Sequence, residues 1–259
     1  MITIKSAREL ETMARAGRIV GETLALMRRE IAPGMTTLDL DRLAEQFIRS
    51  HEGAVPSFKG LYGFPATLCT SINHEVVHGI PSSKRVLKDG DIVSVDVGVF
   101  LGGLHADSAV TLAVGDVKPE ARALLDVTQK ALMAGIAAVK ANAQVGDIGA
   151  AVQRVAEAAG YSVVRELVGH GIGTQFHEEP QVPNFGAPGT GPRLKPGMTI
   201  AIEPMVNAGR AEVKTLNDRW TVVTADGKLS AHFEHTVAVT EQGARILTMA
   251  APVTADANA

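Results

Sequence analysis

The sequence contains the stretch LKDGDIVSVD at Leu87–Asp96 and a related stretch, LKPGMTIAIE, at Leu194–Glu203. Both have a Leu-Lys-x-Gly turn followed by an apolar strand that ends on a carboxylate. Each half of the chain also carries a second acid on another strand-like run, Asp107 in the first half and Glu234 in the second. The repeated pattern predicts that these four carboxylates meet in one place.

A cluster of four carboxylates is electrostatically unfavourable. Two like charges about 4 Å apart repel by roughly 4 kcal/mol at an effective dielectric constant of about 20, whereas a whole domain is stable by only roughly 5–15 kcal/mol. The acids must therefore keep protons, with raised pKa values, or surround cations. Two divalent ions would balance the four charges.

The composition is that of a globular protein with a sizeable core. The chain has 259 residues, 46% of them hydrophobic. A formal net charge of -3 and a pI near 6.2, without a basic block, argue against a nucleic-acid-binding surface. No apolar run approaches the roughly 18 residues of a membrane span.

We expect a cytoplasmic location. The N-terminal residues lead straight into a charged helical pattern, unlike the apolar core of a signal peptide. The single cysteine, Cys69, cannot form an internal disulfide, which agrees with a reducing compartment. We interpret its thiol as a small apolar wall residue.

Two pairs of helices are expected, each followed by strand-like segments. Capping boxes at Ser6–Glu9 and Thr36–Asp39 open the first pair. The predicted helices span about 6–32, 36–53, 120–140 and 146–159. The pattern indicates an α+β fold with an internal duplication, in which pseudo-symmetric halves at about 1–114 and 115–250 share one interior. We expect a single catalytic domain at 1–250 and a disordered tail at 251–259.

The first pair of acids has a predictable geometry. If Gly102 and Gly103 form a two-residue hairpin turn, Gly98 lies opposite Asp107. Because side chains alternate along a strand, Asp96 then lies on the same face as Asp107, as its diagonal neighbour. One cation can be ligated by both carboxylates, and Gly98 leaves room beside them.

Histidines supply further candidate ligands and acids. His170 lies between glycines that allow a close backbone approach, while His177 and His78 occur in FHEEP and HGIP segments. A mostly carboxylate set with one imidazole favours Mn, Fe(II) or Co. A lone strand acid or loop histidine is more often structural, but the duplicated arrangement favours ligands. His51, His105 and His232 are given no role.

The segment HEVVH at His74–His78 matches the zincin pattern, in which two histidines one helical turn apart bind zinc. That pattern requires a helix. Val76 and Val77 are β-branched, and Gly79 and Pro81 follow, so we predict a strand here and reject the zincin interpretation.

Seven short motifs together point to one family. They are CTSIN at Cys69–Asn73 with HGIP at His78–Pro81, DIVSVD at Asp91–Asp96, HAD at His105–Asp107, GHGIG at Gly169–Gly173, IEP at Ile202–Pro204 and FEHT at Phe233–Thr236. Through these motifs the chain resembles the methionine aminopeptidases of the bacterial type I kind, from about Ile4 to Met249. The resemblance implies the pita-bread fold, in which two pseudo-symmetric halves form a curved antiparallel sheet backed by helices.

The resemblance also implies residue roles. The metal ligands would be Asp96, Asp107, His170, Glu203 and Glu234, with Asp107 and Glu234 bridging two divalent ions of Co, Mn, Fe(II) or Zn.

The remaining roles concern the substrate. His177 would lie near the scissile carbonyl and His78 near the peptide nitrogen, and Glu203 would shuttle a proton. The methionine side-chain pocket would involve Phe64, Cys69, Phe176 and Trp220, while Leu61 stands at the rim where the family commonly has an aromatic residue.

The implied activity is removal of N-terminal methionine from peptides and nascent chains with a small second residue, by attack of a metal-activated hydroxide. The chain would act as a monomer, without nucleic-acid or membrane partners, and contact with the ribosome stays open. One alternative is a proline-directed aminopeptidase of the same fold. Another is a peptide-binding pita-bread module without catalysis.

Overall fold

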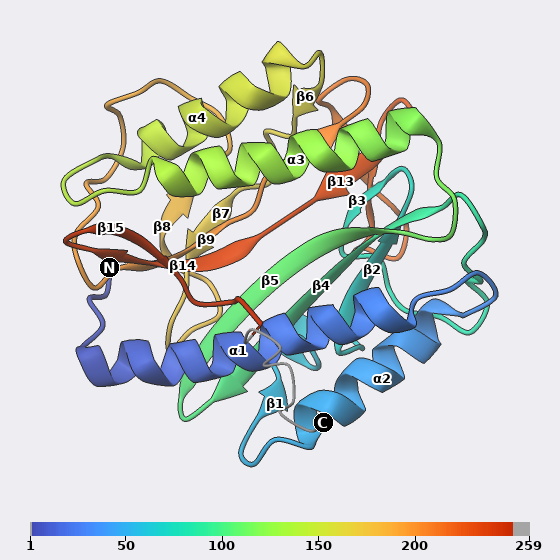
Figure 1. The fold of residues 1–259 in the computed structure, drawn as a ribbon, viewed down its shortest axis with the longest axis horizontal. Helices are drawn as coiled ribbons and strands as arrows, with labels where there is room; N and C mark the ends of the chain where they lie inside the picture. The colour runs from blue at the N-terminus through green and yellow to red at the C-terminus, as the bar shows by residue number, and fades with distance from the viewer. Residues whose placement is uncertain (1, 251–259) are drawn as a thin grey trace, which may run out of the picture.

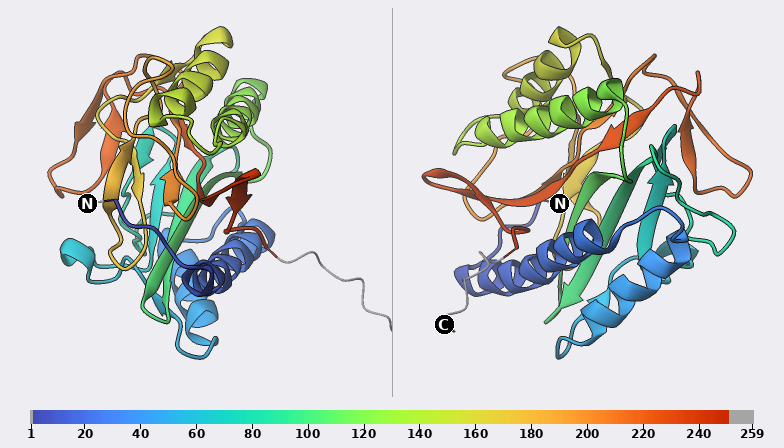
Figure 2. Two further views of the ribbon diagram at one scale, coloured as in Figure 1. Left: turned by 90° about the vertical axis from the view of Figure 1, so that its left-hand side faces the viewer. Right: turned by 45° about the vertical axis from the view of Figure 1, so that its right-hand side comes forward.

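Two pairs of helices lie on either side of a layer of β-strands in the computed structural model (Figure 1). The structure describes residues 2–250, so the expected tail at 251–259 lies outside the described residues. In all views α1 (Ala7–Glu30) and α2 (Thr37–Arg49) stay together at one end (Figure 2). Helices α3 (Pro119–Ala137) and α4 (Val145–Ala158) cover the other end.

The predicted helices are confirmed, including both capping boxes. The Ser6 side chain accepts from the Glu9 N–H, and the Thr36 side chain accepts from the Asp39 N–H. Helix α2 ends at Arg49 rather than near 53, because residues 50–54 continue as separate tight turns. Helix α3 likewise ends at residue 137, earlier than the predicted 140.

The first half builds one sheet around its long hairpin. Strand β4 (Ile92–Leu101) pairs along its whole length with β5 (Leu104–Ala113). Its other edge pairs with β1 (Val55–Pro56) near residues 99–100 and with β2 (Leu68–Ile72) at residues 93–97. Alternate valines of β4 pack with buried residues of α1 and α2 in one apolar core. Because side chains alternate between the two faces of a strand, Asp96 and Asp107 lie on the opposite face of the hairpin.

The second half builds a five-stranded sheet in the order β15-β14-β9-β7-β8. Helices α3 and α4 pack on it through a second apolar core. Its strands are β7 (Gly169–Gly171), β8 (Glu178–Val182), β9 (Thr199–Ile202), β14 (His235–Thr240) and β15 (Gly243–Ile246).

Two small sheets complete the layer. One has the order β13-β10-β6 and the other the order β11-β12-β3, which pairs a first-half strand with a second-half strand. Their strands are β3 (Glu75–Val77), β6 (Ser162–Val163), β10 (Met205–Asn207), β11 (Val213–Thr215), β12 (Val222–Thr224) and β13 (Ser230–His232).

The order of two helices followed by strands occurs twice along the chain, as the sequence predicts. The exact division at 114 and 115, and the extent of one catalytic domain over 1–250, stay predictions. Among residues 2–250, the structure contains no helix with the length and apolar character needed to cross a bilayer.

Candidate metal centre

Asp96 and Asp107 project from the two strands of the β4–β5 hairpin. The turn residues Gly102 and Gly103 have positive φ angles of 58° and 88°, and the hairpin pairs Gly98 with Asp107. This confirms the register predicted from the sequence. The two aspartates are diagonal neighbours on one face.

Glu234 reaches Asp107 because β5 is hydrogen-bonded to the chain around the start of β14. The Glu234 N–H donates to the Ala109 carbonyl at 2.9 Å, and the Ser108 hydroxyl donates to the Glu234 carbonyl. The Thr236 hydroxyl accepts from the Asp107 N–H at 3.0 Å and donates toward the Asp107 carboxylate Oδ1 at 2.8 Å. The two halves of the chain are therefore joined at the acids themselves.

Glu203 and His170 come from paired strands of the second half. Glu203 directly follows β9, and His170 is the middle residue of β7. A Cβ at Gly169 would lie 2.3 Å from a β9 carbonyl oxygen, and one at Gly171 would lie 2.2 Å from a β8 carbonyl oxygen. Only glycine allows this approach of the three strands around His170.

The His170 ring is oriented by its own backbone neighbour. Its Nδ1 lies 2.8 Å from the Gly171 carbonyl, so this nitrogen carries the proton and donates. Its Nε2 lies 3.6 Å from both Asp107 Oδ2 and Glu203 Oε1. A carbonyl that holds one ring nitrogen leaves the other free as a metal ligand.

Burial raises the pKa of all four carboxyl groups. The pKa of Asp96 is well above its ordinary value because of burial and the Asp107 charge. Burial, followed by the charges of Asp107 and Asp96, raises the pKa values of Glu203 and Glu234 in the same way. Burial raises the pKa of Asp107 to about 6, although the hydrogen bond from Thr236 opposes the shift.

These residues fit a divalent cation. Ligand atoms of Asp107, His170 and Glu234 all lie within 4.8 Å of one another, and the buried Oδ1 of Asp96 has no hydrogen-bond partner within residues 2–250. Among residues 2–250, the ion pairs that the four acids form are with histidines, and none is with a lysine or arginine. Carboxylates with one imidazole suit Mn, Fe(II), Co or Zn.

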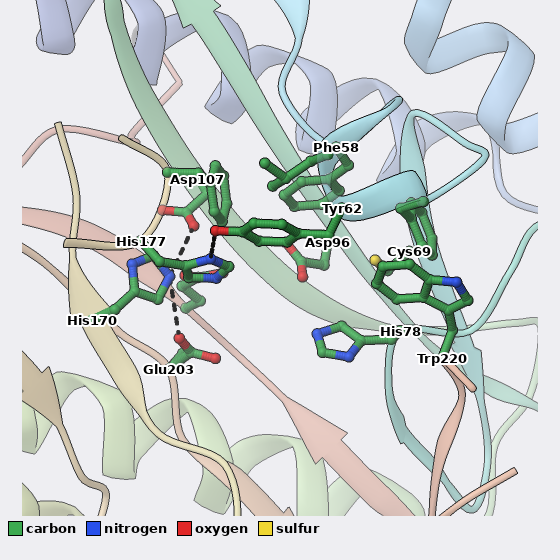
Figure 3. A pocket seen from close by; sticks show the side chains of 14 residues that line it. Phe58, Tyr62, Cys69, His78, Asp96, Asp107, His170, His177, Glu203 and Trp220 are labelled. Carbon is green, nitrogen blue, oxygen red and sulfur yellow. Dashed lines mark hydrogen bonds and ion pairs between the residues drawn. The ribbon is translucent and has the colours of Figure 1, made fainter. Parts of the chain in front are cut away.

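A cavity of about 160 Å³ brings together all the residues that the sequence predicts for the site (Figure 3). Its predicted lining residues are Asp96, Asp107, His170, Glu203, Glu234, His78, His177, Phe64, Cys69, Phe176 and Trp220. Leu61 also lines the cavity, and its place at the rim stays a prediction. Phe58 and Tyr62 line it too, and the sequence analysis missed both.

The apolar end of the cavity is built from aromatic rings. Phe64 meets Trp220 edge to face at 5.1 Å between ring centroids, and Phe58 meets Phe176 at 5.3 Å. Trp220 lies just before β12 in the second half of the chain. The pairing of β12 with the first-half strand β3 brings it next to first-half residues of the cavity. Burial raises the pKa of the Cys69 thiol well above its usual value, which agrees with its interpretation as an apolar wall residue.

The two predicted substrate-contacting histidines have lowered pKa values, which favours their neutral forms. Burial, with the nearby charge of His177, lowers the pKa of His78 to about 4. Burial and the charge of His170 lower the pKa of His177 to about 4. Residues Glu75–Val77 form a strand, which confirms that the helix required by the zincin pattern is absent there.

His232 is a feature that the sequence analysis did not assign to the site. Its imidazole is 2% exposed, neither ring nitrogen has a hydrogen-bond partner among the described residues, and its Nε2 lies 3.8 Å from Glu203 Oε2. Its position two residues before Glu234 was the available signal, because alternate residues of an extended chain share a face. By contrast, His105 is hydrogen-bonded to Ser57 at 2.9 Å, as expected for a structural residue.

Comparison with known proteins identifies the family. The model of metallopeptidase family M24 matches residues 11–241. The chain belongs to this M24 family. This M24 metallopeptidase is 55% identical over 249 residues to the methionine aminopeptidase of Clostridium perfringens, covering 96% of this chain and 99% of that relative. It is 54% identical over 248 residues to methionine aminopeptidase 1 of Bacillus subtilis, with coverage of 96% and 99%.

A solved structure agrees with these sequence similarities. The crystal structure of methionine aminopeptidase from Rickettsia prowazekii superposes on this M24 metallopeptidase with a TM-score of 0.94 and 45% identity, covering 96% of this chain and 100% of that one. The predicted pita-bread fold and the predicted family are therefore confirmed. The protein is a hydrolase of the metal-dependent peptidase class.

Proposed function

We propose that this M24 metallopeptidase removes N-terminal methionine from peptides and nascent chains, with a preference for a small second residue. The observation that carries the proposal is a single cavity in which a pocket with aromatic walls adjoins the acid cluster. A thioether suits such walls, because sulfur makes favourable contacts with aromatic rings. The similarity to methionine aminopeptidases supports the same activity.

Two divalent ions would be held by Asp96, Asp107, His170, Glu203 and Glu234. Bound ions would supply Lewis acidity and lower the pKa of water toward neutrality. The raised pKa values of the four acids support this assignment, since cations would take the place of the retained protons. Co, Mn, Fe(II) and Zn are all compatible with the donor set.

The side chains around the acids would handle the peptide bond. A neutral imidazole has a single N–H to donate, and His177 would direct it to the scissile carbonyl oxygen, where negative charge develops. His78 would contact the peptide nitrogen. Glu203 would accept the proton of the attacking water and deliver it to that nitrogen as the carbon–nitrogen bond breaks.

The methionine side chain would occupy the apolar end of the cavity, against Phe64, Cys69, Phe176 and Trp220. Phe58 extends the same wall through its contact with Phe176. These four wall residues carry no charged group that could pair with a charged first side chain. A charged first residue would therefore lose hydration without compensation.

The experiment that tests the proposal uses metal-free protein supplemented with one divalent ion at a time. Three peptides are compared: Met-Ala-Ser, Met-Lys-Ser and Ala-Pro-Ser. Cleavage of Met-Ala-Ser alone is the expected result. Cleavage of Ala-Pro-Ser would favour the proline-directed alternative, and peptide binding without cleavage under any ion would favour the non-catalytic module.

Further expectations accompany this function. A cytoplasmic location agrees with the single buried cysteine. We also propose action as a monomer on nascent chains. Sedimentation would test the monomeric state, and co-pelleting with ribosomes would test for contact at the site of synthesis.

A further inference from the structure

An exposed tyrosine covers one of the proposed catalytic histidines. Tyr62 lies in the short 3-10 turn η1 (Leu61–Gly63), and 71% of its surface is exposed. Its φ angle is 50°, in the left-handed region that bulky residues rarely adopt. Burial of so exposed a ring contributes little stability and does not offset the unfavourable backbone conformation. The position of Tyr62 therefore points to a role in the neighbouring site.

Tyr62 contacts His177 in two ways. The rings are stacked, with centroids 5.7 Å apart and an interplanar angle of 11°. The Tyr62 hydroxyl also lies 3.3 Å from Nδ1 of His177, as the dashed line in Figure 3 shows. The two residues are 115 positions apart and belong to opposite halves of the chain. The contact therefore bridges the cavity that both residues line.

The hydrogen bond has a consequence for the protonation of the imidazole. Among residues 2–250, the Tyr62 hydroxyl is the hydrogen-bond partner of the His177 ring. The other ring contacts of His177 are edge-on, with His170 at 4.4 Å and Phe176 at 4.8 Å. If a hydroxyl donates to Nδ1 of a neutral imidazole, the ring proton must reside on Nε2.

We propose that Tyr62 is a positioning residue for the peptidase reaction. Its hydroxyl donates to Nδ1 of His177, which keeps the ring proton on Nε2, and its stacked ring holds the plane of the imidazole. His177 then presents an N–H donor to the oxygen that gains charge at the scissile carbonyl. This inference rests on the proposed role of His177 in peptide cleavage.

The test compares Tyr62→Phe with Tyr62→Ala. The Phe variant keeps the stacked ring and loses only the hydroxyl, so kcat on Met-Ala-Ser should fall about three- to tenfold with KM within about twofold. The Ala variant should show a larger fall in kcat, because it also removes the stacking on His177. Tyr161→Phe, at the other tyrosine of the chain, is the matched control and should change neither constant.

A spectroscopic readout separates this proposal from the proposed function. The ¹⁵N shifts of the His177 ring, assigned by their loss in His177→Gln, should show a protonated Nε2 in metal-free and zinc-loaded protein. Tyr62→Phe should move the ring toward a mixture of tautomers. Unchanged ¹⁵N shifts or an unchanged kcat in Tyr62→Phe would overturn the positioning role. Failure of the wild-type protein to cleave Met-Ala-Ser would instead refute the proposed function.

Discussion

The hydroxyl of Thr236 accepts from the backbone N–H of Asp107 at 3.0 Å and lies 2.8 Å from the carboxylate Oδ1 of the same residue. One side chain of the second half thus holds both the backbone and the carboxylate of an acid in the first half. Because the contact is fully buried, loss of the hydroxyl would leave a donor without a partner.

Thr236→Val keeps the side-chain shape and removes the hydroxyl. We expect the free energy of unfolding to fall by about 1–3 kcal/mol and the metal affinity to fall about tenfold. Urea unfolding and isothermal titration with Mn would measure the two effects. Thr128→Val, which removes a buried hydroxyl that donates to the Leu124 carbonyl inside α3, should affect stability alone. Equal metal affinities of wild type and Thr236→Val would contradict the prediction.

Asp107→Asn removes one charge from the cluster at nearly constant volume. Burial disfavours the charged form of Asp107, so the metal-free variant should unfold at a temperature no lower than that of the metal-free wild type. Added Mn should raise the melting temperature of the wild type, by a stabilisation of about 2.7 kcal/mol at one hundred times Kd, and leave the variant unchanged.

The matched control for that prediction is Asp41→Asn, since Asp41 is also buried but accepts from the N–H groups of Thr67 and Leu68. Burial also raises the pKa of Asp41, and an Asn Oδ1 can still accept from both N–H groups, so this variant should be no less stable without metal and should keep the metal-induced rise in melting temperature. A metal-induced rise in Asp107→Asn as large as in the wild type would show that Asp107 is not a ligand.

Gly98→Ala tests how the hairpin shapes the apolar pocket. An added Cβ would lie 2.9 Å from Phe176 Cε2, 2.9 Å from Ser57 Cβ and 3.0 Å from Phe58 Cε1, so the rings must shift. We expect kcat/KM for Met-Ala-Ser to fall about tenfold or more, with the bound metal content unchanged.

A control for Gly98→Ala is Gly135→Ala, where the added Cβ would lie 2.7 Å from Val152 Cγ2 at the α3–α4 contact. That variant should change stability and not kcat/KM. Loss of metal from Gly98→Ala, measured by elemental analysis, would mean that the missing side chain is needed for the arrangement of the metal ligands rather than for the shape of the apolar pocket.

Lys5 anchors the loop that carries His177. Lys5 Nζ lies 2.6 Å from Glu178 Oε2, and the two side chains are only 5% and 6% exposed. Lys5→Met should lower the free energy of unfolding by about 3 kcal/mol, because it leaves a buried carboxylate without its cation. In a double-mutant cycle, Lys5→Met with Glu178→Gln should cost less than the sum of the single variants, and additive costs would argue against coupling.

The same ion pair predicts a pH dependence. Burial alone would raise the pKa of Glu178, but hydrogen bonds from Lys5, Thr3 and the Gln175 N–H, with the Lys5 charge, lower it from 4.5 to about 2. Between these pH values the unfolded chain binds more protons, so this stability is present above about pH 4.5 and is lost as the pH falls through about 2. Acid titration of the free energy of unfolding should therefore show a shallower loss in Lys5→Met than in the wild type.

Much of the local geometry followed from sequence patterns. The capping boxes located the first two helices, and the Gly102-Gly103 turn with the strand period placed Asp96 and Asp107 on one face in the observed register. The duplicated strands also led to Glu203 and Glu234, which do line the same cavity. The catalytic and ligand roles of these residues stay predictions that the variants above address.

The sequence by itself determined the helices, the hairpin register and the repeated acids, because caps, turns and side-chain alternation depend on near neighbours in the chain. Only the tertiary structure decided that Tyr62 stacks on His177, that Trp220 crosses to the first half through the β3–β12 pair, and that the buried imidazole of His232 lies beside Glu203. These contacts join segments distant in the chain, and their meeting depends on how the two halves pack around a shared interior. Short sequence motifs do not predict this packing, because the same motifs are compatible with many relative placements of the two halves.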